Sequence, residues 1–211
     1  MADIDKLYSD TEGYVKQLES IYLSKYIADK TSSPKDFDND VKSFCILSHA
    51  ALEEFSETIA ITVMDKTVEN FITNHKISEP LVSLMHFKSN GASYLSKSED
   101  DDKIEILTSY DYIRLKLLEI KERFSKEVFN NHGVSLKYLK QLLMPVSIDI
   151  INDVTLLNSL KLLAKERGSY AHKFLEKGSV KKSIAPEAAS TIVSDCLKLC
   201  FDIKEKAKAK I

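Results

Sequence analysis

An arginine and a histidine five positions apart, Arg167 and His172, are the residues of this 211-residue chain whose types and spacing best suit chemistry. An arginine keeps its charge at every physiological pH, and its planar donors fit phosphate oxygens. A histidine titrates near neutral pH and can give or take a proton. Cleavage of RNA without a metal ion requires both abilities, so the pair suggests that chemistry.

The helix expected to carry Arg167 has an apolar stripe. Leu156, Leu160 and Leu163 recur at intervals of three and four residues, and Arg167 continues the series. A guanidinium on a core-facing stripe is costly to bury unless it is paired. Two interpretations stay open. Arg167 either pairs with a core acid or extends its charged end to solvent, or it binds a phosphate.

The relation between Arg167 and His172 depends on the two residues that follow the arginine. In an unbroken helix, residues five positions apart point about 140° away from each other. Gly168 and Ser169 lower the helix propensity, so we expect them to allow a break or a wider turn. The two side chains can then reach one groove; otherwise a second subunit must complete the cleft.

A second histidine, His49, lies four residues before Glu53, so the two share one face of a predicted helix. In one interpretation, the histidine and the carboxylate bind each other at the edge of the core and have no further task. The other is that both residues line a cleft beside Arg167 and orient His172 or the phosphate. Two interpretations are likewise open for Ser169: its hydroxyl hydrogen-bonds either to a phosphate or to the neighbouring backbone or solvent.

A basic cluster follows the Arg–His pair. It suits either a solubilising loop or a patch that follows the phosphates of a nucleic acid beside the cleft. The chain as a whole is nearly neutral, with 30 Lys and Arg against 32 Asp and Glu, so nucleic-acid binding must come from such a local patch. The cluster consists of Lys173, Lys177, Lys181 and Lys182.

The elements that position these residues are predicted to be helices. Only 5 Gly and 4 Pro are present, which favours long helices over the many turns of a sandwich or barrel. The longest helix is predicted from Pro34, capped by Ser33, to Asn74. At about 60 Å it is expected to contain a bend or short break. Asp153 is expected to cap the helix that carries Arg167. Further helices are predicted at about 4–28, 78–87, 104–130, 135–143 and 186–208.

We therefore expect an all-α bundle forming one domain over residues 1–211, with its core at about 37–203 and the helix 4–28 packed on it. The three cysteines lie in apolar helical patterns without a CxxC pair, which indicates buried thiols in a reduced, cytoplasmic protein and no zinc site. No stretch reaches 18 apolar residues, so no membrane span is expected. The acidic run 99–102 suits a solvated loop and helix start, with a divalent-metal site as the alternative.

Several blocks of the sequence resemble the HEPN domain, an all-helical family marked by an Arg, four to six residues, and a His. The helix containing Ser48-His49-Ala50-Ala51-Leu52-Glu53-Glu54-Phe55 is similar to the corresponding helix of the RiboL-PSP type and of related defence-associated HEPN families. So are the blocks 131–136 and 156–172. The resemblance covers roughly residues 37–203.

This resemblance implies RNA cleavage without a metal or other cofactor. Family members commonly form homodimers in which two Arg–His pairs face each other across a cleft. Arg167 would then hold the scissile phosphate. His172 would act as the acid or base on the 2′-hydroxyl or the leaving 5′-oxygen. The usual context is a toxin–antitoxin pair or antiviral defence, with an antitoxin or defence-system protein as partner. A non-catalytic helical module that binds a protein or RNA is the alternative.

Two positions depart from the family's pattern. Family members often have Asn directly after the Arg, where this chain has Gly168. Members with an Arg-x4-His-x-Tyr motif carry a tyrosine two residues after the His, where this chain has Phe174. A modification of that tyrosine is therefore not available here. Tyr170 is a nearby phenol outside the motif and, with Ser169, a candidate supporting residue.

Overall fold

The computed structural model describes residues 3–29, 31–88, 109–130, 133–172, 175–176, 179–180 and 182–211. The regular secondary structure in this part of the chain consists of helices and one small antiparallel hairpin. The elements are α1 (Ile4–Tyr22), α2 (Ser24–Ala28), α3 (Pro34–Asn74), α4 (Glu79–Lys88), α6 (Ser109–Asn130), α7 (Leu136–Leu143), the 3-10 turn η2 (Met144–Val146), α8 (Val154–His172), β1 (Leu175–Glu176), β2 (Ser179–Val180) and α9 (Pro186–Lys208).

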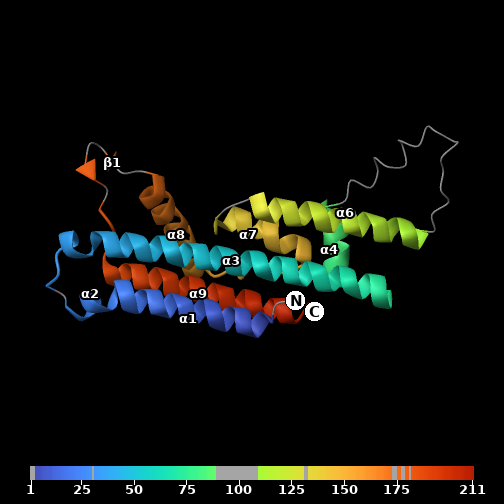
Figure 1. Ribbon diagram of the computed structural model, residues 1–211, viewed down its shortest axis with the longest axis horizontal. Coiled ribbons are helices and arrows are strands. Elements are labelled where there is room, and N and C mark those ends of the chain that lie inside the picture. The colour runs from blue at the N-terminus through green and yellow to red at the C-terminus, as the bar shows by residue number, and fades with distance from the viewer. Residues whose placement is uncertain are drawn as a thin grey trace.

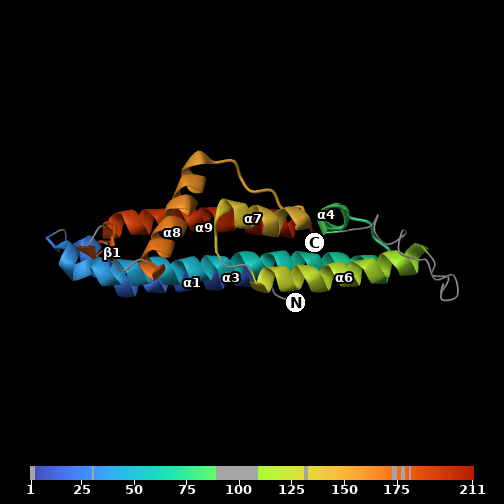
Figure 2. The same ribbon diagram turned by 90° about the horizontal axis from the view of Figure 1, so that it is seen from above.

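Three long helices, α1, α3 and α9, run side by side along the long axis of the molecule (Figure 1). The helices α4, α6 and α7 pack along the C-terminal half of α3. Helix α8 crosses α3 and α9 at a steep angle nearer the other end, as both views show (Figure 2). The functional candidates on α3 and α8 therefore meet where these two helices cross.

Helix α3 has the bounds that the sequence predicts, Pro34–Asn74. The backbone N–H and the hydroxyl of Ser33 both donate to the Asp36 carboxylate at 2.8 Å, which fixes the helix start. His75 ends the helix with a left-handed φ of 52°. The expected break is absent: all 41 residues form one helix. No Gly or Pro interrupts it, and a long series of its side chains is buried against neighbouring helices.

Other predicted elements differ in detail from the structure. The helix predicted at 4–28 divides into α1 and α2 at Leu23, whose side chain is fully buried in the core. The hairpin β1–β2 was not predicted, because two-residue strands leave no pattern in the sequence. The predicted helix start at 104 and the acidic run 99–102, with its alternative metal site, lie outside the described residues.

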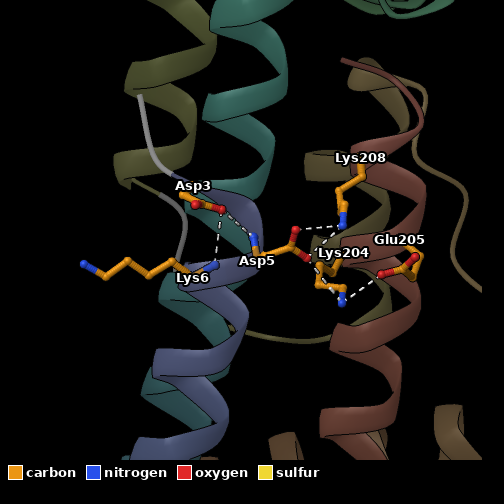
Figure 3. Close-up of polar contacts among 6 residues, drawn as sticks. All are labelled: Asp3, Asp5, Lys6, Lys204, Glu205 and Lys208. Atoms are coloured by element: carbon orange, nitrogen blue, oxygen red, sulfur yellow. Dashed lines mark hydrogen bonds and ion pairs between the residues drawn. The ribbon is translucent and has the colours of Figure 1, made fainter.

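Polar contacts join the first turn of α1 to the last turns of α9 (Figure 3). The Asp5 carboxylate lies 2.7 Å from the Lys208 ammonium and 3.6 Å from that of Lys204. Hydrogen bonding to Lys208 lowers the pKa of Asp5 below its ordinary value. Asp3 caps α1 by accepting from the backbone N–H groups of Asp5 and Lys6. These contacts hold the two ends of the described chain together on one side of the bundle.

Two further predictions concern the cysteines and membrane-crossing helices. The cysteines are free and buried, as expected. Burial raises the pKa of Cys45 and of Cys196 to about 12. Burial also raises the pKa of Cys200 well above its ordinary value. At pH 7 all three are thiols packed as small apolar groups. Among the described helices, none combines the length and the apolar character that crossing a bilayer requires.

Candidate functional site

Helix α8 begins as the sequence predicts. The Asp153 carboxylate accepts from the backbone N–H groups of Thr155 at 2.8 Å and Leu156 at 3.1 Å, which satisfies the first turn. Leu160 and Leu163 then pack into the core. The helix buries its apolar stripe against α3 and α9, and this packing fixes where the residues after Leu163 lie.

The expected break at Gly168 does not occur: α8 continues as one helix to His172. A glycine costs only about 1 kcal/mol in a helix relative to alanine, which is less than the packing of α8 contributes. In this unbroken helix positions 167 and 172 lie about 140° apart around the axis. His172 is the last residue of α8, and its side chain lies outside the described part. The two positions therefore lie on different faces of one copy of α8.

Arg167 lies half-buried at the edge of the α3–α8 contact, one position beyond the buried Glu166. Among the described residues, no carboxylate lies within ion-pair distance of its guanidinium. Its charge acts instead on His49 of α3, whose pKa it helps to lower. The interpretation in which a core acid neutralises Arg167 does not match this arrangement, and the guanidinium keeps its donors for another anion.

His49 and Glu53 reach the connection before α7. The His49 Nε2 accepts from the Val134 backbone N–H at 3.3 Å, and a Glu53 carboxylate oxygen accepts from the Gly133 N–H. Because Nε2 is the acceptor, the ring proton belongs on Nδ1, which lies 3.6 Å from Glu53, too far for a good hydrogen bond. Gly133 has a φ of 127°, a left-handed conformation that suits glycine. Both side chains therefore anchor this connection to α3.

Burial, with the nearby charge of Arg167, lowers the pKa of His49 to about 4. The side chain is only 2% exposed. At neutral pH the imidazole is uncharged and engaged with the backbone, so it is poorly placed to exchange protons with a substrate. The structure thus places His49 within the electrostatic influence of Arg167 and uses both His49 and Glu53 to anchor the connection before α7.

A family model described as RiboL-PSP-HEPN matches residues 6–209. The chain belongs to the RiboL-PSP-HEPN family. The match is wider than the predicted 37–203, so α1 and the last turns of α9 are part of the family's domain. No curated protein and no solved structure matches the chain.

Tyr170 connects α8 of this HEPN domain to the segment before α9. Its hydroxyl accepts from the Ile184 backbone N–H at 3.2 Å. Burial raises the pKa of Tyr170, and a hydrogen bond with Glu166 raises it further. Glu166 was missed by sequence reasoning, although it stands three residues after Leu163 on the buried face. The pair Glu166 and Tyr170 holds the C-terminal end of α8, where His172 lies.

The remaining candidates of the HEPN domain lie near that end of α8. Ser169 is half-buried, and its hydroxyl has no hydrogen-bond partner among the described residues. Lys182 is exposed beside a shallow hollow at the start of α3, which Lys35 also lines. The other three lysines of the basic cluster, Lys173, Lys177 and Lys181, fall outside the described residues or side chains. Within the described part of the chain, no group of three or more His, Cys, Asp or Glu could hold a metal ion.

Proposed function

We propose that this HEPN protein is a metal-independent endoribonuclease whose catalytic residues are Arg167 and His172. The observation that carries the proposal is the state of Arg167. A half-buried guanidinium without a carboxylate partner among the described residues has donors available for an anion, and a phosphate fits them in two-point fashion. Membership of the HEPN family makes RNA the substrate expected for such a site.

The proposed reaction is an intramolecular transesterification. The 2′-hydroxyl of the RNA attacks the adjacent phosphorus, and the bond from phosphorus to the 5′-oxygen breaks. One proton leaves the 2′-oxygen and one reaches the 5′-oxygen, and His172 transfers one of these protons. Arg167 stabilises the negative charge that develops on the phosphoryl oxygens. The products are a 2′,3′-cyclic phosphate, which hydrolyses to a 3′-phosphate, and a 5′-hydroxyl.

The unbroken α8 supports a site formed by two copies of the chain. Since positions 167 and 172 of one helix lie about 140° apart around its axis, a homodimer can bring Arg167 of one copy close to His172 of the other. His49, uncharged at neutral pH, and Glu53 then support the wall beside Arg167. Ser169 and Tyr170 lie between the two catalytic positions, and the lysine cluster 173–182 follows the phosphates on either side of the cut.

Cleavage of RNA in the presence of EDTA tests this function. Purified protein should cut RNA to cyclic-phosphate ends, and Arg167→Ala and His172→Ala should each lower the rate by about two orders of magnitude or more. Arg114→Ala and His86→Ala are matched controls, because both residues are exposed and lie on other helices. Loss of cutting in the controls, or full cutting by either catalytic variant, would contradict the proposal.

A role in toxin–antitoxin or antiviral defence follows from this activity as part of the same proposal. Expression of the wild-type chain should then arrest growth, and His172→Ala should relieve the arrest. The second candidate function is a non-catalytic module that binds RNA or a partner such as an antitoxin. The unbroken α8 supports this second candidate, because positions 167 and 172 of one copy lie on different faces of the helix. It predicts binding without cleavage at any enzyme concentration.

A further inference from the structure

Helix α6 exposes a row of large apolar side chains on its outer face. Phe129 is 80% exposed and Leu118 is 40% exposed, and Leu115 continues the row toward the start of the helix. The opposite face of α6 is buried against α3 through residues such as Leu117 and Phe124. An exposed apolar row on a helix whose core face is already occupied is typical of a surface that binds another protein.

The exposed row follows the repeat of a coiled coil. Its positions are separated by three, four, three and four residues, which keeps them on one line of the helix. The two central positions are polar and the outer ones are apolar. A shallow groove runs along this line. We name the row the α6 seam; it consists of Leu115, Leu118, Glu122, Ser125 and Phe129.

We propose that the α6 seam binds the α6 seam of a second copy of this chain, in antiparallel orientation about a two-fold axis. In this register Leu118 packs against Phe129 of the second copy, and the symmetry repeats this contact at the other end. Between the two apolar layers, the Glu122 carboxylate accepts from the Ser125 hydroxyl of the second copy. Leu118, Glu122, Ser125 and Phe129 thereby each meet a group of matching character.

The charges beside the seam fit the same register. In an antiparallel pair of helices, residue 119 of one helix lies near residue 126 of the other. Glu119 and Lys126 are both largely exposed, with side-chain exposures of 65% and 69%. Among the described residues of one copy, their ion-pair partners are neighbours on the same helix, Lys116 and Glu122. The two-fold axis therefore creates two ion pairs across the interface.

A polar central layer also selects the orientation. If two α6 helices paired in parallel, Glu122 would face Glu122 and the two carboxylates would repel each other. A shift by one layer in the antiparallel pair would place Leu118 against Glu122 and bury a charge against an apolar side chain. A single polar layer in a seam is known to fix register and orientation in this way.

The α6 seam is separate from the Arg167 region. Helix α6 lies along the C-terminal half of α3, whereas α8 crosses the N-terminal half (Figures 1 and 2). The same copy can therefore engage both surfaces at once. The proposal does not depend on the ribonuclease function, and a contact through α6 would double the number of copies in whatever assembly the Arg167 region forms.

Disulfide crosslinking of two variants tests the register. Leu118→Cys protein mixed with Phe129→Cys protein should give a crosslinked dimer under mild oxidation. Each variant alone should not, because two residues 118 lie about 16 Å apart along the paired helices. The native cysteines are buried and do not interfere. A crosslink in Leu118→Cys protein alone would show a parallel contact and overturn the proposal, as would no crosslink in the mixture.

Light scattering of the untreated protein gives an independent measurement. Leu118→Asp should halve the molar mass of the assembly, whereas Ile21→Asp, at an exposed position on α1, should leave it unchanged and serves as the matched surface control. Lys126→Glu should weaken the association, and Glu119→Lys combined with Lys126→Glu should restore it by reversing both ion pairs. An unchanged mass for Leu118→Asp, with the fold intact by circular dichroism, would exclude the α6 contact.

Discussion

At the scale of single residues, the supporting groups around Arg167 are held by contacts that the sequence does not contain. His49 binds the backbone of Val134, 85 positions away, and Glu53 binds that of Gly133, 80 positions away. Their spacing of four predicted a shared helix face, which is correct, but the loop they anchor is visible only in three dimensions. The free state of Arg167 likewise depends on which acids surround it, and no periodicity reveals that.

The low pKa of His49 predicts a pH-dependent stability. Between pH 6.5 and about 4, His49 is protonated in the unfolded chain but stays uncharged in the folded chain. The free energy of unfolding therefore falls as the pH falls through this window. At pH 5 the loss is about 2 kcal/mol. Urea denaturation at pH 7 and pH 5 should show this drop in the wild type and a smaller drop in His49→Gln. His86→Gln, at an exposed site, should behave like the wild type.

The Tyr170 hydroxyl predicts a second residue-scale effect. Tyr170→Phe removes the acceptor for the Ile184 N–H and a partner of the buried Glu166, and should cost about 1–3 kcal/mol of stability. Tyr14→Phe, on the exposed face of α1, should change the free energy of unfolding by less than about 0.5 kcal/mol. Equal stabilities of the two variants would show that the Tyr170 contacts contribute little.

At the scale of elements, the sequence predicts helices well where local signals mark their ends. Pro34 and Ser33 fixed the start of α3, Pro186 that of α9, and Asp153 that of α8. Gly168 misled because its low propensity is a local preference of about 1 kcal/mol, which tertiary packing overrides. The hairpin β1–β2 and the division at Leu23 arise from packing between distant segments and leave no local signal.

The straight path of α8 through Gly168 makes a prediction. A methyl group added at this position would meet no atom within 4 Å. Gly168→Ala should therefore raise the stability by about 0.5–1 kcal/mol in urea denaturation, because alanine loses less backbone entropy in a helix. RNA cleavage should be retained. A destabilised or inactive Gly168→Ala protein would indicate that α8 must bend at this position to function.

At the scale of the whole molecule, the all-helical fold and the HEPN family follow from the scarcity of Gly and Pro and from a few sequence blocks. The arrangement of α8 across α3 does not. Helix α8 crosses one half of α3, and its continuous course places positions 167 and 172 on different faces. Helix α6, whose seam is exposed, lies along the other half of α3 (Figure 1). Each of these two features supports one of the two proposed contacts between copies of the chain.

A composite site built from two copies is the central claim, and mixing two inactive variants tests it most directly. Arg167→Ala and His172→Ala proteins are unfolded together, refolded and assayed on RNA in EDTA. If each site takes its arginine and histidine from different copies, mixed dimers contain one intact site, and about a quarter of the wild-type activity should return. Each variant refolded alone serves as the control. Activity no higher in the mixture than in the separate variants would contradict the claim.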